Sequence, residues 1–378
     1  ILILSALIGQ ILSLSAREVT SFNEGWLFKR GPFSQDPVKV AAQWNADWET
    51  VNLPHTWNAK DMQVKADAFY EGVGYYRKTQ FFGNELKGKR VFLRFEGVGA
   101  NTEVYVNGKL VGMHRGAYSA FAFEIGTALK LGAENEIMVK ADNASCPDVI
   151  PVNHNLFGVY GGIYRPVWLY IFPTEHILRD EIRVKTLDYQ KKKIAVDVKT
   201  TGVGMLCTEI FDGEKLIVSK TIQSEDTVEN AICDVKEKTV EYHTEMVLEQ
   251  TELWSPKYPK LYTCRVTFGE DIQEVRFGIR TVTCDAEHGF CINGKRVILR
   301  GACIHHDNGL LGACAYDFAE RRKIRILQEN GYNAIRSAHN PCSKAMLDAC
   351  DEFGMLVMDE YIDGWYIHKT KYDYADII

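Results

Sequence analysis

The sequence lacks the patterns that mark several classes of protein. It contains no C-x-x-C or H-x-x-H spacing, so we expect no structural zinc site. Its net charge of −6 is small for 378 residues, which argues against a protein that binds nucleic acid through phosphate contacts. The 10 cysteines are widely scattered, and their irregular spacing favours buried free thiols over a disulfide framework.

Long apolar runs are missing too, apart from residues 1–16, which read ILILSALIGQILSLSA. This run is short for a transmembrane helix and contains Ser and Gln, so we expect no membrane anchor. Small residues at its end are typical of a secretory signal, and we interpret it as the remnant of one. This interpretation predicts a periplasmic or secreted protein. The alternative is that the run forms a first strand or helix of the fold.

The length indicates two or three domains, and the first of them, residues 17–172, has an all-β pattern. Apolar residues alternate along residues 91–96, as they do in a half-buried strand. Asn107-Gly108 is a strong signal for a type I′ hairpin turn. Many short strands with Gly and Asn turns predict a β-sandwich or jelly roll.

A second all-β unit is predicted over residues 173–282. Apolar and polar residues alternate along residues 194–199, and Asp212-Gly213 predicts another hairpin turn. A unit of about one hundred residues suits an immunoglobulin-like sandwich.

The pattern changes in residues 283–378, where apolar runs at 297–299 and 355–358 predict strands and residues 333–336 are expected to form a short strand between them. Helices are predicted between them, so the order is β-α-β-α-β, which is typical of a parallel sheet or barrel.

Local signals predict where these two helices begin and end. Asp317 is the expected N-cap of the first, with Glu320 three residues later as in a capping box, and Gly331 is its expected end. Ser343 is the expected N-cap of the second helix, and Gly354 its expected end.

Polar side chains follow each of the three predicted strands, where the functional residues of β/α barrels lie. We predict that these residues share one site, and the alternative is a set of separate structural roles. They are His305, His306 and Asp307 after the first strand, Arg336, Ser337, His339 and Asn340 after the second, and Asp359, Glu360 and Asp363 after the third.

Several segments together resemble glycoside hydrolase family 2, the beta-galactosidase/beta-glucuronidase family. Residues 333–341 read NAIRSAHNP, residues 354–360 read GMLVMDE and residues 300–307 read RGACIHHD. Nearer the start, residues 161–167 read GGIYRPV and residues 53–57 read LPHTW. The resemblance covers nearly the whole chain after Ala16, and such long, spaced motifs are far more specific than one short motif.

The resemblance implies a jelly-roll sugar-binding domain, an immunoglobulin-like domain and a TIM barrel, in that order. It also implies retaining hydrolysis by two Glu residues, one in an Asn-Glu pair at the fourth barrel strand and one near the seventh. No Asn-Glu pair stands between the third predicted strand and Ile378, so we expect the acid/base and the nucleophile to lie beyond Ile378. Neither catalytic residue is therefore assigned here, and we expect this polypeptide alone to be inactive.

The expected activity of the whole enzyme is beta-galactosidase-like. The alternatives are a beta-glucuronidase, a beta-mannosidase or a non-catalytic carbohydrate-binding protein.

Among the polar residues, Asp359 and Glu360 are not expected to be the catalytic pair. The two carboxyl groups of a retaining glycosidase lie about 5 Å apart across one bond, whereas neighbours on one strand face opposite ways. For the same reason, at most one of His305 and His306 faces the pocket. Arg336 could also form an ion pair inside the barrel, for instance with Glu360, while it supports the site.

The resemblance assigns sugar contact to His305, Arg336 and His339, and the shared-site hypothesis adds Asn340 and Glu360. Asn155 is a further candidate, because it stands where the family often has an Asp that reaches the sugar. The expected partner is a beta-galactoside-type glycan, and in a homo-oligomer a second copy would cover the open edge of the barrel segment.

No cofactor is expected. The metal-binding Glu of a family member aligns with Gly364, which argues against a magnesium site, although Asp363 is adjacent.

Overall fold

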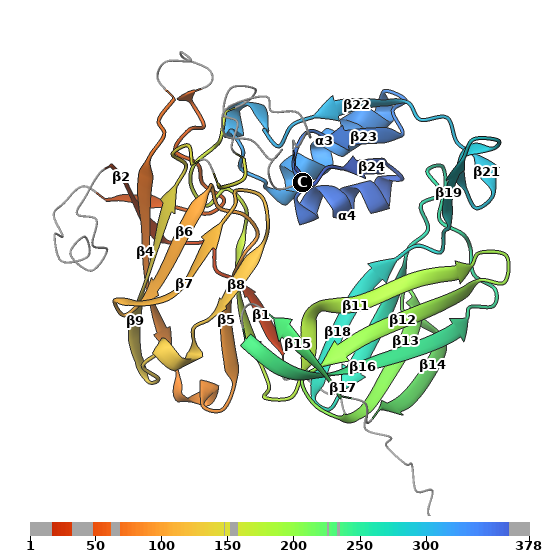
Figure 1. Ribbon diagram of the computed structural model, residues 1–378, viewed down its shortest axis with the longest axis horizontal. Coiled ribbons are helices and arrows are strands. Elements are labelled where there is room, and N and C mark those ends of the chain that lie inside the picture. Colours follow the sequence, from red (N-terminus) through yellow and green to blue (C-terminus); the bar gives the residue numbers. More distant parts are fainter. Residues whose placement is uncertain are drawn as a thin grey trace, which may run out of the picture.

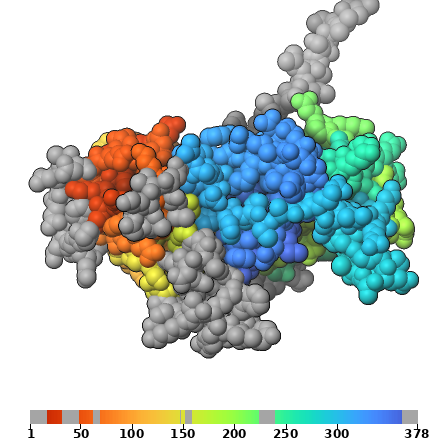
Figure 2. Space-filling model, turned by 90° about the horizontal axis from the view of Figure 1, so that it is seen from above, coloured from red at the N-terminus to blue at the C-terminus, as the bar shows by residue number. Residues whose placement is uncertain are grey.

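The computed structural model describes residues 17–31, 48–61, 69–146, 148–151, 158–224, 227–232 and 235–362. Residues 1–16 lie outside them, so the export signal stays a prediction. No helix among the described residues is long and apolar enough to cross a membrane. The chain forms two β-sandwiches, and a parallel β/α segment lies between them (Figure 1, Figure 2). The predicted fold class and the order of its parts are confirmed.

The first sandwich packs a six-stranded sheet of order β3-β2-β4-β9-β6-β7 against a four-stranded sheet of order β1-β10-β5-β8. Its elements are β1 (Glu18–Ser21), β2 (Trp26–Arg30), β3 (Glu49–Val51), β4 (Val73–Phe82), η2 (Asn84–Leu86), β5 (Arg90–Phe95), β6 (Asn101–Val106), β7 (Lys109–Arg115), β8 (Phe121–Glu124), η3 (Gly126–Ala128), β9 (Ala133–Asp142) and β10 (Val167–Phe172).

Alternation builds the core of this sandwich, because successive side chains of a strand face opposite sides of the sheet. On β5, Val91, Leu93 and Phe95 are at most 1% exposed, and they join one large apolar cluster between the two sheets. The predicted hairpin turn is confirmed, since Asn107 and Gly108 have φ angles of 51° and 78° between β6 and β7.

The second sandwich pairs the sheets β11-β12-β16-β15 and β14-β13-β17-β18 around its own apolar core. The turn between β13 and β14 contains Gly213 with a φ of 59°, as the sequence predicted. The strands are β11 (Ile177–Asp188), β12 (Lys193–Thr200), β13 (Gly204–Asp212), β14 (Lys215–Ser224), β15 (Thr227–Ile232), β16 (Val235–Val247), β17 (Tyr262–Phe268) and β18 (Asp271–Phe277).

A small sheet, β19-β20-β21, leads from the second sandwich into the β/α segment (Figure 1). In that segment β22, β23 and β24 are parallel, and their register aligns Gly301 with Ala334 and Ala334 with Leu356. The elements are β19 (Val282–Asp285), β20 (Gly289–Ile292), β21 (Lys295–Arg296), β22 (Gly301–Ile304), η4 (Gly309–Leu311), α3 (Asp317–Glu329), β23 (Ala334–Ser337), α4 (Lys344–Phe353) and β24 (Leu356–Asp359).

The first predicted strand of this segment was placed too early. Residues 297–299 are not a strand, and β22 begins at Gly301. The Asn333 side chain explains the difference, because its amide donates to the Ile298 carbonyl (3.0 Å) and accepts from the Arg300 amide (2.7 Å). These side-chain bonds take the place of the backbone bonds that a strand would form there.

The helix signals were partly correct. Ser343 caps α4 by accepting from the Met346 amide (3.2 Å), and Gly354 ends that helix with a φ of 75°. The capping box at Asp317 is wrong, because the N-cap is Tyr316 and no side chain caps α3. Glu320 instead accepts from the Asn308 side chain (2.8 Å), which lies outside the helix.

All nine described cysteines are free thiols, as expected, but not all of them are buried. Four are exposed or half-buried, so burial was wrongly predicted for Cys146, Cys207, Cys284 and Cys303. Alternation along a strand places a residue on one face, and only the packing of that face decides whether the thiol is covered.

Buried polar contacts join the three parts of the chain. Between the sandwiches, Arg17 forms a bidentate ion pair with Asp271, and both hydrogen bonds measure 2.7 Å. Between the second sandwich and α4, the Trp254 ring nitrogen donates to the Asp351 carbonyl (3.0 Å). Gly354 packs there against Pro256, and a Cβ at this glycine would lie 2.2 Å from the Pro256 carbonyl oxygen.

Arg165, which is 4% exposed, joins the first sandwich to the β/α segment. Its guanidinium donates to the carbonyls of Pro341 (2.8 Å) and Tyr118 (2.9 Å) and approaches that of Cys342 at 3.5 Å. Hydrogen bonds from a charged donor are stronger than neutral ones, so this side chain fixes the loop after β23 against the sandwich.

We predict that Arg165→Ala lowers the free energy of unfolding by about 2–4 kcal/mol, because buried carbonyls lose their charged donor. Arg183→Ala is the matched control, since that side chain is 59% exposed and its loss costs at most about 1 kcal/mol. Urea unfolding followed by tryptophan fluorescence measures both. Equal midpoints for the two variants would contradict the role assigned to Arg165.

Candidate functional site

The carboxyl ends of β22, β23 and β24 bring four of the predicted residues together. The Glu360 carboxylate forms an ion pair with Arg336 and accepts from His339 Nδ1 at 2.6 Å. Arg336 Nη2 lies 3.4 Å from His339 Nδ1, and the rings of His305 and His339 are 6.2 Å apart. The predicted ion pair between Arg336 and Glu360 is therefore present.

This cluster is open to solvent on one side. The side chain of Arg336 is 41% exposed, whereas those of Glu360 and His339 are 19% and 22% exposed. His305 donates from Nδ1 to the Ala338 carbonyl, which orients its ring across the site. Donors and acceptors thus converge at an accessible surface, and such an arrangement suits the recognition of hydroxyl groups.

His306 faces away from the cluster, as alternation predicted. Its ring packs among three tyrosine rings of the first sandwich, with centroid distances of 5.1, 5.6 and 5.9 Å to Tyr118, Tyr160 and Tyr164. Burial, with help from the nearby charges of Arg165 and others, lowers the pKa of His306 to about 3. The imidazole is therefore neutral at ordinary pH.

Asn340 lies on the same side as His306. It is 1% exposed, its amide nitrogen is 3.4 Å from His306 Nδ1, and its backbone carbonyl accepts from Ser337 Oγ at 2.6 Å. These contacts separate Asn340 from the cluster around Glu360, so its sugar contact stays a prediction. Asn155, the remaining candidate, lies outside the described residues.

The two acidic neighbours at the end of β24 have different partners. Asp359 accepts from the backbone amide of Cys342 at 2.9 Å, whereas Glu360 binds Arg336 and His339. Opposite orientation along the strand explains the difference. The expectation that they do not form one catalytic pair agrees with this geometry.

The two catalytic Glu residues of the family have no counterpart assigned in this cluster. The described part of the chain ends at Ile362, so Ile378 and the residues just before it lie outside it. The expectation that the acid/base and the nucleophile lie beyond Ile378 is therefore not tested by the structure and stays a prediction.

Sequence reasoning missed one member of the cluster, Cys303. Its Sγ lies 3.4 Å from Arg336 Nη1, and this hydrogen bond together with Glu360 raises the pKa of Arg336. The contact follows from the register, which sets Cys303 directly beside Arg336 on the neighbouring strand. A parallel register between segments about thirty residues apart has no local sequence signal.

Within the described part of the chain, no three His, Cys, Asp or Glu side chains are grouped so that they could hold a metal ion. Asp363 and Gly364 lie outside it.

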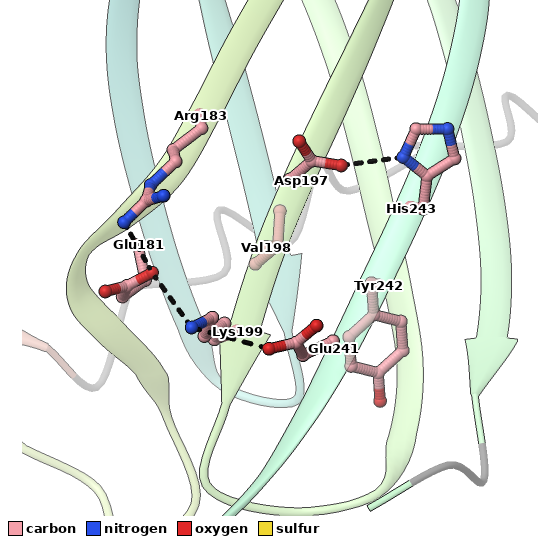
Figure 3. A pocket seen from close by; sticks show the side chains of 8 residues that line it. All are labelled: Glu181, Arg183, Asp197, Val198, Lys199, Glu241, Tyr242 and His243. Carbon is pink, nitrogen blue, oxygen red and sulfur yellow. Dashed lines mark hydrogen bonds and ion pairs between the residues drawn. The ribbon is translucent and has the colours of Figure 1, made fainter. Parts of the chain in front are cut away.

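A separate hollow of about 380 Å³ lies on the second sandwich (Figure 3). His243 Nδ1 contacts Asp197 at 2.6 Å, and Lys199 pairs with Glu181 and Glu241. Burial alone would raise the pKa of Asp197, but its hydrogen bonds with His243 and Lys185 lower it. The charged side chains pair with one another, so we assign this hollow no chemistry. It is lined by Glu181, Arg183, Asp197, Val198, Lys199, Glu241, Tyr242 and His243.

Three family models match the chain in the order of its parts. Residues 16–173 match "Glycosyl hydrolases family 2, sugar binding domain" and residues 176–280 match "Glycosyl hydrolases family 2". Residues 285–367 match "Glycosyl hydrolases family 2, TIM barrel domain". The resemblance seen in the sequence motifs is therefore confirmed.

Curated relatives include a beta-galactosidase of Bacteroides ovatus, 33% identical over 96% of this chain and 43% of the relative. A beta-glucuronidase of Bacteroides fragilis is 31% identical over 96% of this chain and 53% of the relative. The chain thus spans about half the length of the curated relatives it matches.

Among solved structures, a putative beta-galactosidase from Bacteroides fragilis is 44% identical, with a TM-score of 0.78 over 90% of this chain and 53% of that one. A beta-glucuronidase of Bacteroides uniformis is 28% identical, with a TM-score of 0.80 over 95% of this chain and 44% of that one.

The low pKa of His306 predicts a pH effect on stability. In the unfolded chain His306 takes up a proton below its usual pKa of 6.5, whereas in the folded chain it stays neutral down to about pH 3. The unfolded state therefore binds more protons between these pH values, and the free energy of unfolding falls as the pH falls through this window. The contribution is at most about 1.4 kcal/mol per pH unit. His306→Gln should reduce the fall in unfolding free energy across the window, measured by urea unfolding, and the exposed His288→Gln should not. Identical pH profiles for His306→Gln and the unsubstituted protein would refute the prediction.

Proposed function

The chain belongs to glycosyl hydrolase family 2, and from this membership we propose that it is part of a beta-galactosidase-like, retaining glycoside hydrolase. In this proposal the first sandwich and the β/α segment bind the non-reducing sugar of a beta-linked glycan. Two Glu residues of later barrel strands, beyond Ile378, cleave the bond, as the family resemblance implies.

The observation that carries the proposal is the cluster of His305, Arg336, His339 and Glu360 at the carboxyl ends of three parallel strands. Active sites of β/α barrels form at this end of the strands. Both oxygens of Glu360 are already engaged, one by Arg336 and one by His339. Glu360 therefore suits substrate positioning better than proton transfer, which needs a carboxyl group free to exchange its proton.

The charge of the cluster favours a neutral sugar. The guanidinium of Arg336 is balanced by the Glu360 carboxylate, so this pair offers no surplus positive charge to the carboxylate of a glucuronide. A beta-glucuronidase is the second candidate, because several relatives carry that name at similar identity. Measuring kcat/KM for an aryl beta-galactoside and for an aryl beta-glucuronide decides between them, and the proposal requires the higher value for the galactoside. The value for an aryl beta-mannoside should be measured as well.

We predict that a polypeptide of these 378 residues alone does not hydrolyse an aryl beta-galactoside. The reason is that the pair of catalytic carboxylates, which supplies most of the rate enhancement of a glycosidase, is expected beyond Ile378. Release of the aryl group by pure protein, at a rate above that of buffer, would contradict this. A preparation of a beta-galactosidase relative serves as the positive control.

We also predict that Glu360→Gln lowers kcat/KM at least about tenfold in the enzyme that contains this segment. Arg336 and His339 donate to different oxygens of Glu360, and the NH2 group that replaces one of them in Gln cannot accept a hydrogen bond. Glu352→Gln is the matched control, since Glu352 of α4 also binds two cations, Arg276 of β18 and Arg321 of α3. Equal kcat/KM values for the two variants would contradict the role of Glu360 in the substrate site.

A further inference from the structure

A small cavity lies behind the candidate site, between the first sandwich and the β/α segment. It is enclosed by Arg165 of the sandwich, Glu320 of α3, and Asn340 and Ser343 of the loop after β23, among others. Its volume is about 10 Å³, which is at the lower limit for one water molecule.

Two residues that line this cavity each have a buried side-chain oxygen that receives no hydrogen bond from a described residue. Glu320 and Asn340 are each 1% exposed, and among the described residues neither Glu320 Oε2 nor Asn340 Oδ1 receives a hydrogen bond. The other carboxylate oxygen of Glu320 accepts from Asn308 at 2.8 Å. Lys323 Nζ lies 3.5 Å from Oε2, an ion pair without the geometry of a hydrogen bond. Buried acceptors of this kind nearly always have a partner in folded proteins.

We propose that this cavity is a binding site for one structural water molecule, which donates its two hydrogens to Glu320 Oε2 and Asn340 Oδ1. The hydroxyl of Ser343 accepts from the Met346 amide at 3.2 Å, and its hydrogen is able to donate to the water oxygen. Three hydrogen bonds are the usual number for a buried water.

The charges around the cavity favour water over a cation. Lys323 already faces the Glu320 carboxylate, and the guanidinium of Arg165 lines the same cavity. A metal ion would add a further positive charge beside two others, and hard cations take six or more oxygen ligands, which this cavity does not provide. A neutral molecule with two donors fits both the size and the charge.

The water would link α3 to the loop that carries the candidate site. Asn340 directly follows His339, which contacts Glu360 on the other side of the same loop. Glu320 was expected to cap its own helix, and the structure directs it to this cavity instead. The site is independent of the sugar specificity proposed above.

A crystal structure of the protein at about 1.5 Å resolution tests the proposal. We expect one ordered peak at about 2.6–3.2 Å from both oxygens, with no anomalous signal after a thallium(I) soak. A thallium peak at this position would make it a monovalent cation site. That result, an absent peak, and a direct hydrogen bond between Glu320 and Asn340 would each overturn the proposal.

Solution measurements on variants provide a second test. Oxygen-17 relaxation dispersion counts long-lived buried waters, and Asn340→Leu should lose one of them. Glu329→Leu, on the exposed face of the same α3 helix, should keep the count unchanged. A folded Asn340→Leu variant with an unchanged count would contradict the site, and the crystal test on the unsubstituted protein stands if this variant does not fold.

Discussion

The buried guanidinium of Arg165 is the interaction on which the geometry of the candidate site depends. It reaches from the first sandwich to the carbonyls of Pro341 and Cys342, immediately after His339 and Asn340. The loop that carries these side chains is thereby held by charge-assisted bonds shielded from water, which are stronger than bonds at the surface. The first sandwich therefore contacts the loop beside the candidate site directly, through a side chain that is 4% exposed.

The end of β22 and the loop after β23 each have one side that faces solvent and one side that faces the first sandwich. On one side Arg336, His339 and Glu360 form a charged cluster open to solvent. On the other, the neutral ring of His306 packs among tyrosine rings and beside Asn340. Alternation along the strand separates these sides, so one short segment carries the solvent-open cluster and also packs against the first sandwich.

Local patterns predicted the elements well where neighbouring residues alone determine them. The Asn107-Gly108 turn, the Ser343 cap and the Gly354 helix end all depend on the preferences of one or two residues. Predictions failed where a distant side chain intervened. The Asn333 side chain binds the backbone at residues 298 and 300, and β22 begins only after them. Glu320 accepts a hydrogen bond from Asn308 instead of capping the start of its own helix.

The sequence by itself determined the family, the order of the three parts and the polar residues at the strand ends. Each of these follows from motifs, from the periods of strands and helices, and from turn chemistry, which are properties of short segments. Only the tertiary structure decided which side chains meet. It placed Cys303 beside Arg336, turned Asn340 away from Glu360, and joined Arg165 to Pro341 across 176 positions of the chain. Such contacts depend on register and packing between distant elements, and no short stretch of sequence encodes them.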